Sequence, residues 1–180
     1  MARLPFVDPT QARDDPELRA LYGDIADLRG GVLNLYQVLA HQPSALRAFM
    51  VMSRYVRDDS SLDPSLRELA ILATGYALDV TYEKYHHLPA ARRAGVSEAK
   101  LEAFPDWWTS TEFTALERTV LAYADSVARE RAIDDATFRA LRDSLPVSAV
   151  IDLALTVGWY HLCAAILGPL KIETENRSNR

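Results

Sequence analysis

Residues 149–167 form the most apolar stretch of the chain, and a stretch of this kind has to be buried either in a membrane or in a protein core. A membrane-spanning helix needs about 20 nearly uncharged residues. Asp152, Thr156 and His161 interrupt the stretch, and Gly158 lies within it. We therefore expect a buried helix in the core of a globular domain and no membrane partner.

The rest of the chain is typical of an all-α protein. Apolar residues recur at helical spacing, for example at Leu18, Leu21 and Ile25, and no run of alternating polar and apolar residues is long enough to predict a sheet. At about 150 residues per domain, 180 residues predict one domain. We place it at residues 17–180, after a proline-containing N-terminal arm at residues 1–16.

The apolar spacing and the helix-capping residues predict eight helices. Asp63 can accept backbone N–H bonds as a cap, and Pro64 fits the first helical position, where its missing N–H is not needed. Ser97 is a similar cap, and the pair Gly168-Pro169 is expected to end the last helix. The predicted helices cover residues 17–28, about 43–58, 64–77, 82–94, 98–104, 111–129, 135–145 and 148–167.

Charge and cysteine content exclude several classes of function. The 25 acidic and 20 basic residues give a net charge of −5 without a basic block, so no nucleic acid partner is expected. The single cysteine, Cys163, excludes an intramolecular disulfide, a CxxC pair and a multi-cysteine zinc site. The first residues contain no apolar core of a signal peptide. We therefore expect a cytoplasmic protein.

Three segments carry a family resemblance. Arg-Glu-Leu-Ala-Ile-Leu at 67–72, Tyr-Glu-Lys-Tyr-His-His at 82–87 and Ala-Arg-Arg-Ala-Gly-Val-Ser at 91–97 resemble the carboxymuconolactone decarboxylase and alkyl hydroperoxidase D-like family. Residues 30–36 and 155–160 also resemble longer members. The resemblance implies a multi-helix bundle of the alkyl hydroperoxidase D-like type that needs no cofactor and forms a homo-oligomer, a trimer or a hexamer.

The chain departs from the hydroperoxidase members at the redox positions. Those members use a Glu, then a CxxC motif, then a His four residues after the second Cys. The matching positions here are Glu68, Val80, Glu83 and His87, so both cysteines are missing. A thiolate and its resolving thiol carry out the peroxidase chemistry. We therefore expect no thiol peroxidase activity.

What remains is a set of proton-transfer groups. Glu68, Glu83 and His87 can move a proton near neutral pH, and a carboxylate beside a histidine orients the ring. The resemblance implies cofactor-independent decarboxylation, or lactone isomerisation or hydrolysis, of a small carboxylated or lactone-containing metabolite. We expect His87 to donate the proton, Glu68 to orient it and Glu83 to be a second acid or base.

Five further residues are candidates for binding the substrate. Asn34 and Tyr36 follow a Gly-Gly turn, and the other three are polar-tipped groups among apolar residues. Buried Tyr and Trp side chains often only satisfy one hydrogen bond, so a purely structural role is the alternative. The five candidates are Asn34, Tyr36, Tyr82, Trp159 and His161.

Other interpretations of the site stay open from the sequence. Glu83 and His87 can form an ordinary ion pair one helical turn apart, and Glu68 can pair with Arg118 instead. No metal is expected, although Glu83 and His87 with Glu68 or His86 could bind one; otherwise His86 would be a surface or packing residue. The remaining alternatives are a non-catalytic binding or scaffold protein and a residual peroxidase that depends on Cys163.

Overall fold

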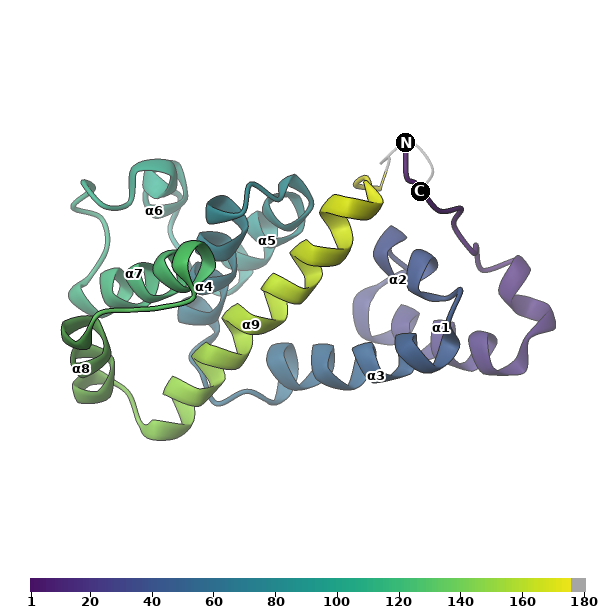
Figure 1. The fold of residues 1–180 in the computed structure, drawn as a ribbon, viewed down its shortest axis with the longest axis horizontal. Coiled ribbons are helices and arrows are strands. Elements are labelled where there is room, and N and C mark those ends of the chain that lie inside the picture. Colours follow the sequence, from purple (N-terminus) through teal and green to yellow (C-terminus); the bar gives the residue numbers. More distant parts are fainter. Residues whose placement is uncertain (176–180) are drawn as a thin grey trace.

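Helices account for all the regular structure in the computed structural model, which describes residues 1–175. These residues contain nine α-helices and no strand, so the predicted all-α fold is confirmed (Figure 1). The helices are α1 (Pro16–Arg29), α2 (Asn34–Leu39), α3 (Pro43–Arg54), α4 (Pro64–Ala77), α5 (Thr81–Arg93), α6 (Glu98–Ala103), α7 (Ala115–Glu130), α8 (Asp135–Ser144) and α9 (Val147–Leu170). There are also three short helical turns: η1 (Gln11–Asp14) precedes α1, η2 (Tyr55–Asp59) follows α3, and η3 (Phe104–Asp106) follows α6.

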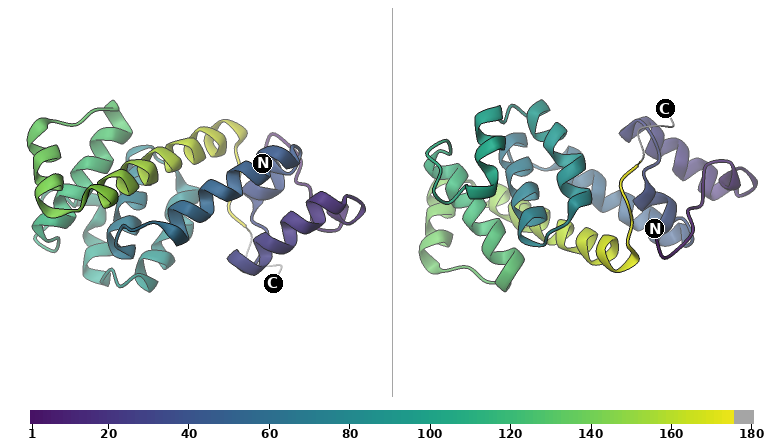
Figure 2. Two further views of the ribbon diagram at one scale, coloured as in Figure 1. Left: turned by 90° about the horizontal axis from the view of Figure 1, so that it is seen from below. Right: turned by 90° about the horizontal axis from the view of Figure 1, so that it is seen from above.

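The long helix α9 joins two groups of helices. Helices α1 to α3 lie at one end of the molecule, α6 to α8 lie at the other, and α9 runs between them (Figures 1 and 2). The buried side chains form two apolar clusters that divide in the same way. Leu153 and Val157 of α9 belong to the cluster with α4 and α7, whereas Trp159 and Leu167 belong to the cluster with α1 to α3.

As predicted, α9 is a core helix. It is long and apolar enough to cross a membrane, but half of its apolar window is buried inside the protein, as in the core helix of a globular domain. The expected stop at Gly168-Pro169 is wrong, because α9 continues to Leu170. Pro169 lies in the last turn of α9, where the helix loses only the one hydrogen bond that a proline, without an N–H, cannot donate. The helix ends at its C-cap Lys171, whose φ is 51°.

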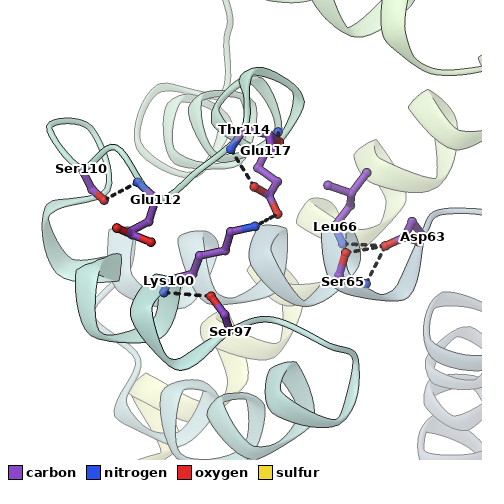
Figure 3. A network of polar contacts seen from close by, with 9 residues as sticks. All are labelled: Asp63, Ser65, Leu66, Ser97, Lys100, Ser110, Glu112, Thr114 and Glu117. Carbon is purple, nitrogen blue, oxygen red and sulfur yellow. Dashed lines mark hydrogen bonds and ion pairs between the residues drawn. The ribbon is translucent and has the colours of Figure 1, made fainter.

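Capping groups fix the start of several helices, as Figure 3 shows. The Asp63 side chain accepts the N–H groups of residues 65 and 66, and the Ser97 side chain accepts that of Lys100. Thr114 and Glu117 form a capping box, so α7 begins later than the predicted residue 111. Lys100 also donates to Glu117 over 2.6 Å, which fixes α6 against the start of α7.

One helix was not predicted. The six-residue helix α2 is absent from the prediction, because its N-cap, Leu33, makes no side-chain cap bond.

Candidate functional site

The turn between α4 and α5 sets the position of the three predicted proton-transfer groups. Glu68 lies in the middle of α4, while Glu83 and His87 lie one turn apart on α5. Asp79 takes a left-handed conformation in the turn, with φ of 52°. Gly75 allows the close approach that follows, because a Cβ at this position would lie 3.3 Å from the Cβ of Glu83. The two helices therefore face each other through these side chains.

His87 lies between the two carboxyl groups. Its Nδ1 is 2.7 Å from Glu68 Oε2, and its Nε2 is 3.4 Å from Glu83 Oε2. Glu68 and Glu83 are each only 5% exposed, and His87 is 2% exposed. The structure therefore brings together the three residues that the sequence singled out. Arg118 does not contact Glu68, because its guanidinium donates to the carbonyl groups of Trp107 and Trp108.

Burial and neighbouring charges set the protonation states of this triplet. Burial raises the pKa of Glu83 to about 8, with a further contribution from the charge of Glu68. Burial also lowers the pKa of His87, although Glu68 opposes this. At Glu68 burial acts in the raising direction, but the hydrogen bond of His87 and the charge of Arg57 keep its pKa below the usual value. At pH 7 the site therefore holds an ionised Glu68, a neutral His87 and a protonated Glu83.

These states fix the tautomer of the imidazole. An ionised carboxylate accepts hydrogen bonds only, so Glu68 requires the proton of His87 to be on Nδ1. The Nε2 atom then carries a lone pair and faces the carboxyl group of Glu83. A carboxylic acid and a free imidazole nitrogen thus lie next to each other.

Arg57 is the residue of the site that the sequence analysis missed. It lies on the π-helical turn η2 after α3, and turns of this type are frequent at functional sites. Arg57 lines the same cavity as Glu83 and His87, and its permanent charge lowers the pKa of Glu68. No local sequence motif marks this arginine.

Two members of the triplet, Glu83 and His87, line a small cavity of about 30 Å³. Tyr160 forms one wall, with its ring packed edge-on against His87 at 4.9 Å between centroids. Its pKa is raised well above the usual value by burial. Of the predicted substrate-binding residues, Tyr36, Tyr82 and Trp159 line this cavity. A volume of this size holds about one or two water molecules.

Asn34 and His161 lie outside this cavity. Asn34 binds the C-terminal segment through its backbone N–H and its side chain. His161 lines a neighbouring open groove of about 800 Å³ between the end of α9 and the turn that precedes α5. Tyr82 lines both the groove and the cavity.

His86 has a partner that the sequence did not reveal. Its Nε2 lies 2.7 Å from Glu175 Oε2, so the expected surface or packing role was incomplete. Tyr82 packs against His86 with 4.6 Å between ring centroids and donates to Glu175 Oε1 over 2.8 Å. The C-terminal segment thus lies over the side of α5 that carries the site.

Within residues 1–175, no group of three or more His, Cys, Asp or Glu side chains is arranged to hold a metal ion. Cys163 lines the cavity but is buried, and burial raises the pKa of its thiol well above the usual value.

The fold and one segment of the sequence are similar to the carboxymuconolactone decarboxylase family. Residues 43–126 match the model of this family. The predicted resemblance is thereby confirmed, and the matched segment contains Arg57, Glu68, Glu83 and His87. Both redox cysteines of the CxxC motif are missing from it.

Solved structures show the same fold. The debrominase Bmp8 in complex with 2,3,4-tribromopyrrole has a TM-score of 0.82 at 20% identity, over 97% of this chain and 94% of that one. An uncharacterised peroxidase-related protein with an alkylhydroperoxidase AhpD core from Ralstonia eutropha JMP134 has a TM-score of 0.82 at 21% identity. The match covers 97% of this chain and 93% of that one. An uncharacterised peroxidase-related protein from Silicibacter sp. TM1040 has a TM-score of 0.82 at 19% identity. The match covers 97% of this chain and 92% of that one. No curated protein matches the sequence.

Proposed function

We propose that the protein is a cofactor-independent acid–base enzyme, a decarboxylase or a lactone isomerase or hydrolase that acts on a small carboxylated or lactone-containing metabolite. The observation that carries this proposal is the buried triplet, in which a protonated Glu83 lies 3.4 Å from a neutral His87 oriented by Glu68. Two titratable groups whose environments drive their pKa values apart are typical of acid–base sites.

The triplet suits decarboxylation in the following way. The carbon–carboxyl bond breaks, carbon dioxide leaves, and the electron pair stays on the substrate carbon. Arg57 in the cavity wall stabilises the developing negative charge. Glu83 donates its proton to the carbon, and a water molecule then returns a proton to Glu83, leaving hydroxide that combines with the released carbon dioxide as bicarbonate. The pKa directions favour Glu83 over His87 as the donor, because His87 is neutral before the reaction.

The buried thiol supports an activity other than thiol peroxidation. A peroxidatic cysteine has to be an accessible thiolate. Cys163 is buried, its pKa is raised by burial, and it has no second cysteine as a partner.

The test is turnover by Glu83→Gln and His87→Gln compared with the unmodified protein and Cys163→Ser. Small lactone acids and carboxylated lactones are screened by proton NMR and by release of carbon dioxide. Loss of a general acid or base is expected to lower kcat by about 10²–10⁴-fold. The Cys163→Ser control is expected to keep its rate, and circular dichroism checks the fold of each variant.

A pH profile adds a second criterion. Glu83 has to be protonated to donate, so kcat is expected to fall as the pH rises through about 8. Full turnover in His87→Gln and Glu83→Gln would contradict the proposal. Ligand binding without turnover in any form would instead favour the non-catalytic binding protein.

A further inference from the structure

Two hydrogen-bond donors and one imidazole, from two separate helices, surround one carboxylate. The backbone N–H of Asn34 and the hydroxyl of Tyr82 donate to Glu175 Oε1 over 2.7 and 2.8 Å. The imidazole Nε2 of His86 lies at an ion-pair distance of 2.7 Å from the other oxygen, Oε2, without the geometry of a hydrogen bond. The side-chain amide of Asn34 also donates to the backbone carbonyl of Glu173 over 2.9 Å, which holds the C-terminal segment in place.

These donors favour the ionised form of the carboxylate. Burial alone would raise the pKa of Glu175, but His86, the Asn34 N–H and Tyr82 outweigh it and lower the pKa to about 2. Hydrogen bonds between a charged group and such donors are stronger than neutral ones. The arrangement therefore discriminates a carboxylate from a neutral group of the same shape.

Two of these groups, Tyr82 and His86, lie at the edge of the proton-transfer cavity. Tyr82 and His86 are one helical turn apart on α5, and each directly precedes a member of the triplet, Glu83 or His87. Both Tyr82 and His86 line the cavity of about 30 Å³. With Glu175 in place, the cavity has room for water but not for a metabolite.

We propose that the Asn34 N–H, the Tyr82 hydroxyl and the His86 imidazole form a binding subsite for the carboxylate of a small-molecule substrate, and that Glu175 fills this subsite until the ligand displaces it. The assignment of the ligand as a substrate rests on the proposed function. Donors that stabilise a carboxylate oppose its loss as neutral carbon dioxide. The carboxylate held here is therefore one that the reaction leaves in place.

The test is calorimetric binding of benzoate, with benzamide as the uncharged probe of similar shape. Glu175→Ala removes the internal carboxylate and is expected to bind benzoate about tenfold or more tightly than the unmodified protein. Benzamide is expected to show no such gain. Glu173→Ala is the matched control, because the Glu173 side chain is 61% exposed and does not contact the three groups. Glu175→Gln serves as a second variant that keeps the side-chain shape.

Variants of the donors complete the test. Adding Tyr82→Phe or His86→Gln to Glu175→Ala is expected to remove most of the gain in benzoate affinity, with thermal unfolding as the check on the fold. Equal benzoate affinity in the unmodified protein, Glu175→Ala and Glu175→Gln would overturn the subsite, as would a gain that survives both donor variants. Because the readout is binding, a protein that binds benzoate as expected but turns nothing over contradicts only the proposed function.

Discussion

The carboxyl groups of Glu68 and Glu83 are similarly buried and yet differ in charge. Glu68 has the hydrogen bond of His87 and the positive charges of Arg57 and Arg67 to stabilise its ionised form. Glu83 is more strongly affected by burial, which the charge of Arg57 does not offset. Two residues of one type therefore have different chemical capacities, one as an acceptor and one as an acid.

This difference predicts how stability depends on pH. The pKa of Glu83 in the folded protein is about 8, above the ordinary value of 4.5, so folding favours its protonated form. Its contribution to stability is complete below about pH 4.5 and is lost as the pH rises through 8. Glu83→Gln removes this dependence. We expect the variant to gain a few kcal/mol relative to the unmodified protein between pH 5 and 9.

Urea unfolding at pH 5, 7 and 9 measures this difference. Glu112→Gln, at an exposed position of the same residue type, is expected to change stability equally at all three values. A constant difference between the unmodified protein and Glu83→Gln across the range would contradict a raised pKa at Glu83.

At the residue scale, sequence patterns were sufficient to predict which residues of the site lie together where those residues are close along the chain. The spacing of Glu83 and His87 placed them on one helical face, and the family resemblance added Glu68. Arg57 and Glu175 reach the site through tertiary packing, so no local pattern marks them. The sequence also could not assign charge states, because these depend on burial.

At the element scale, Asp152 shows how a polar residue fixes the core helix. It interrupts the apolar sequence of α9, but its carboxylate accepts hydrogen bonds from the Tyr55 hydroxyl over 2.6 Å and from the Ser61 N–H and hydroxyl over 2.7 Å each. The residue is 3% exposed. Asp152 therefore attaches α9 to the segment that joins α3 to α4.

Asp152→Ala is expected to lower the free energy of unfolding by about 2–3 kcal/mol, since it removes hydrogen bonds to a charged group and leaves the Ser61 N–H without its acceptor. Chemical denaturation checks this value. Asp125→Ala is the control, because Asp125 pairs with Arg129 on the exposed surface of α7, where such a pair contributes little. A loss no larger than that of the control would show that Asp152 does not anchor α9.

The long helices were predictable because their apolar spacing and their caps agree. Asp63 and Ser97 were expected as caps and act as caps. The short helix α2 was not predicted, since six residues contain too little of the helical period to recognise. Residues 55–58 were predicted to continue the helix that begins at Pro43, and they form the π-helical turn η2 instead.

At the scale of the whole molecule, α9 carries an exposed apolar stripe. Val147, Ile151 and Leu162 are 58%, 54% and 47% exposed, and their spacing of 4 and 11 residues places them on one helical face. A Cβ at Gly158, on the same face, would have no neighbour within 4 Å. The family resemblance implies a homo-oligomer, and this stripe is where we expect a second copy of the chain to pack.

Light scattering after size exclusion tests the oligomer. We expect a trimer or a hexamer, and the double variant Ile151→Glu and Leu162→Glu is expected to shift the mass towards the monomer, because it places charges in an apolar contact. Thr137→Glu, which places a charge on α8 instead of on the apolar stripe of α9, is the matched control. An unmodified protein that runs as a monomer at micromolar concentration would contradict the expectation.

The position of α9 in the chain also affects how the protein is made. Translation proceeds from the N-terminus, so α9 leaves the ribosome after α1 to α8. Both apolar clusters need side chains of α9, so neither can close while only α1 to α8 have been synthesised. Glu175, which covers the site, emerges later still. The nascent chain therefore exposes the apolar faces of its earlier helices until α9 has been synthesised.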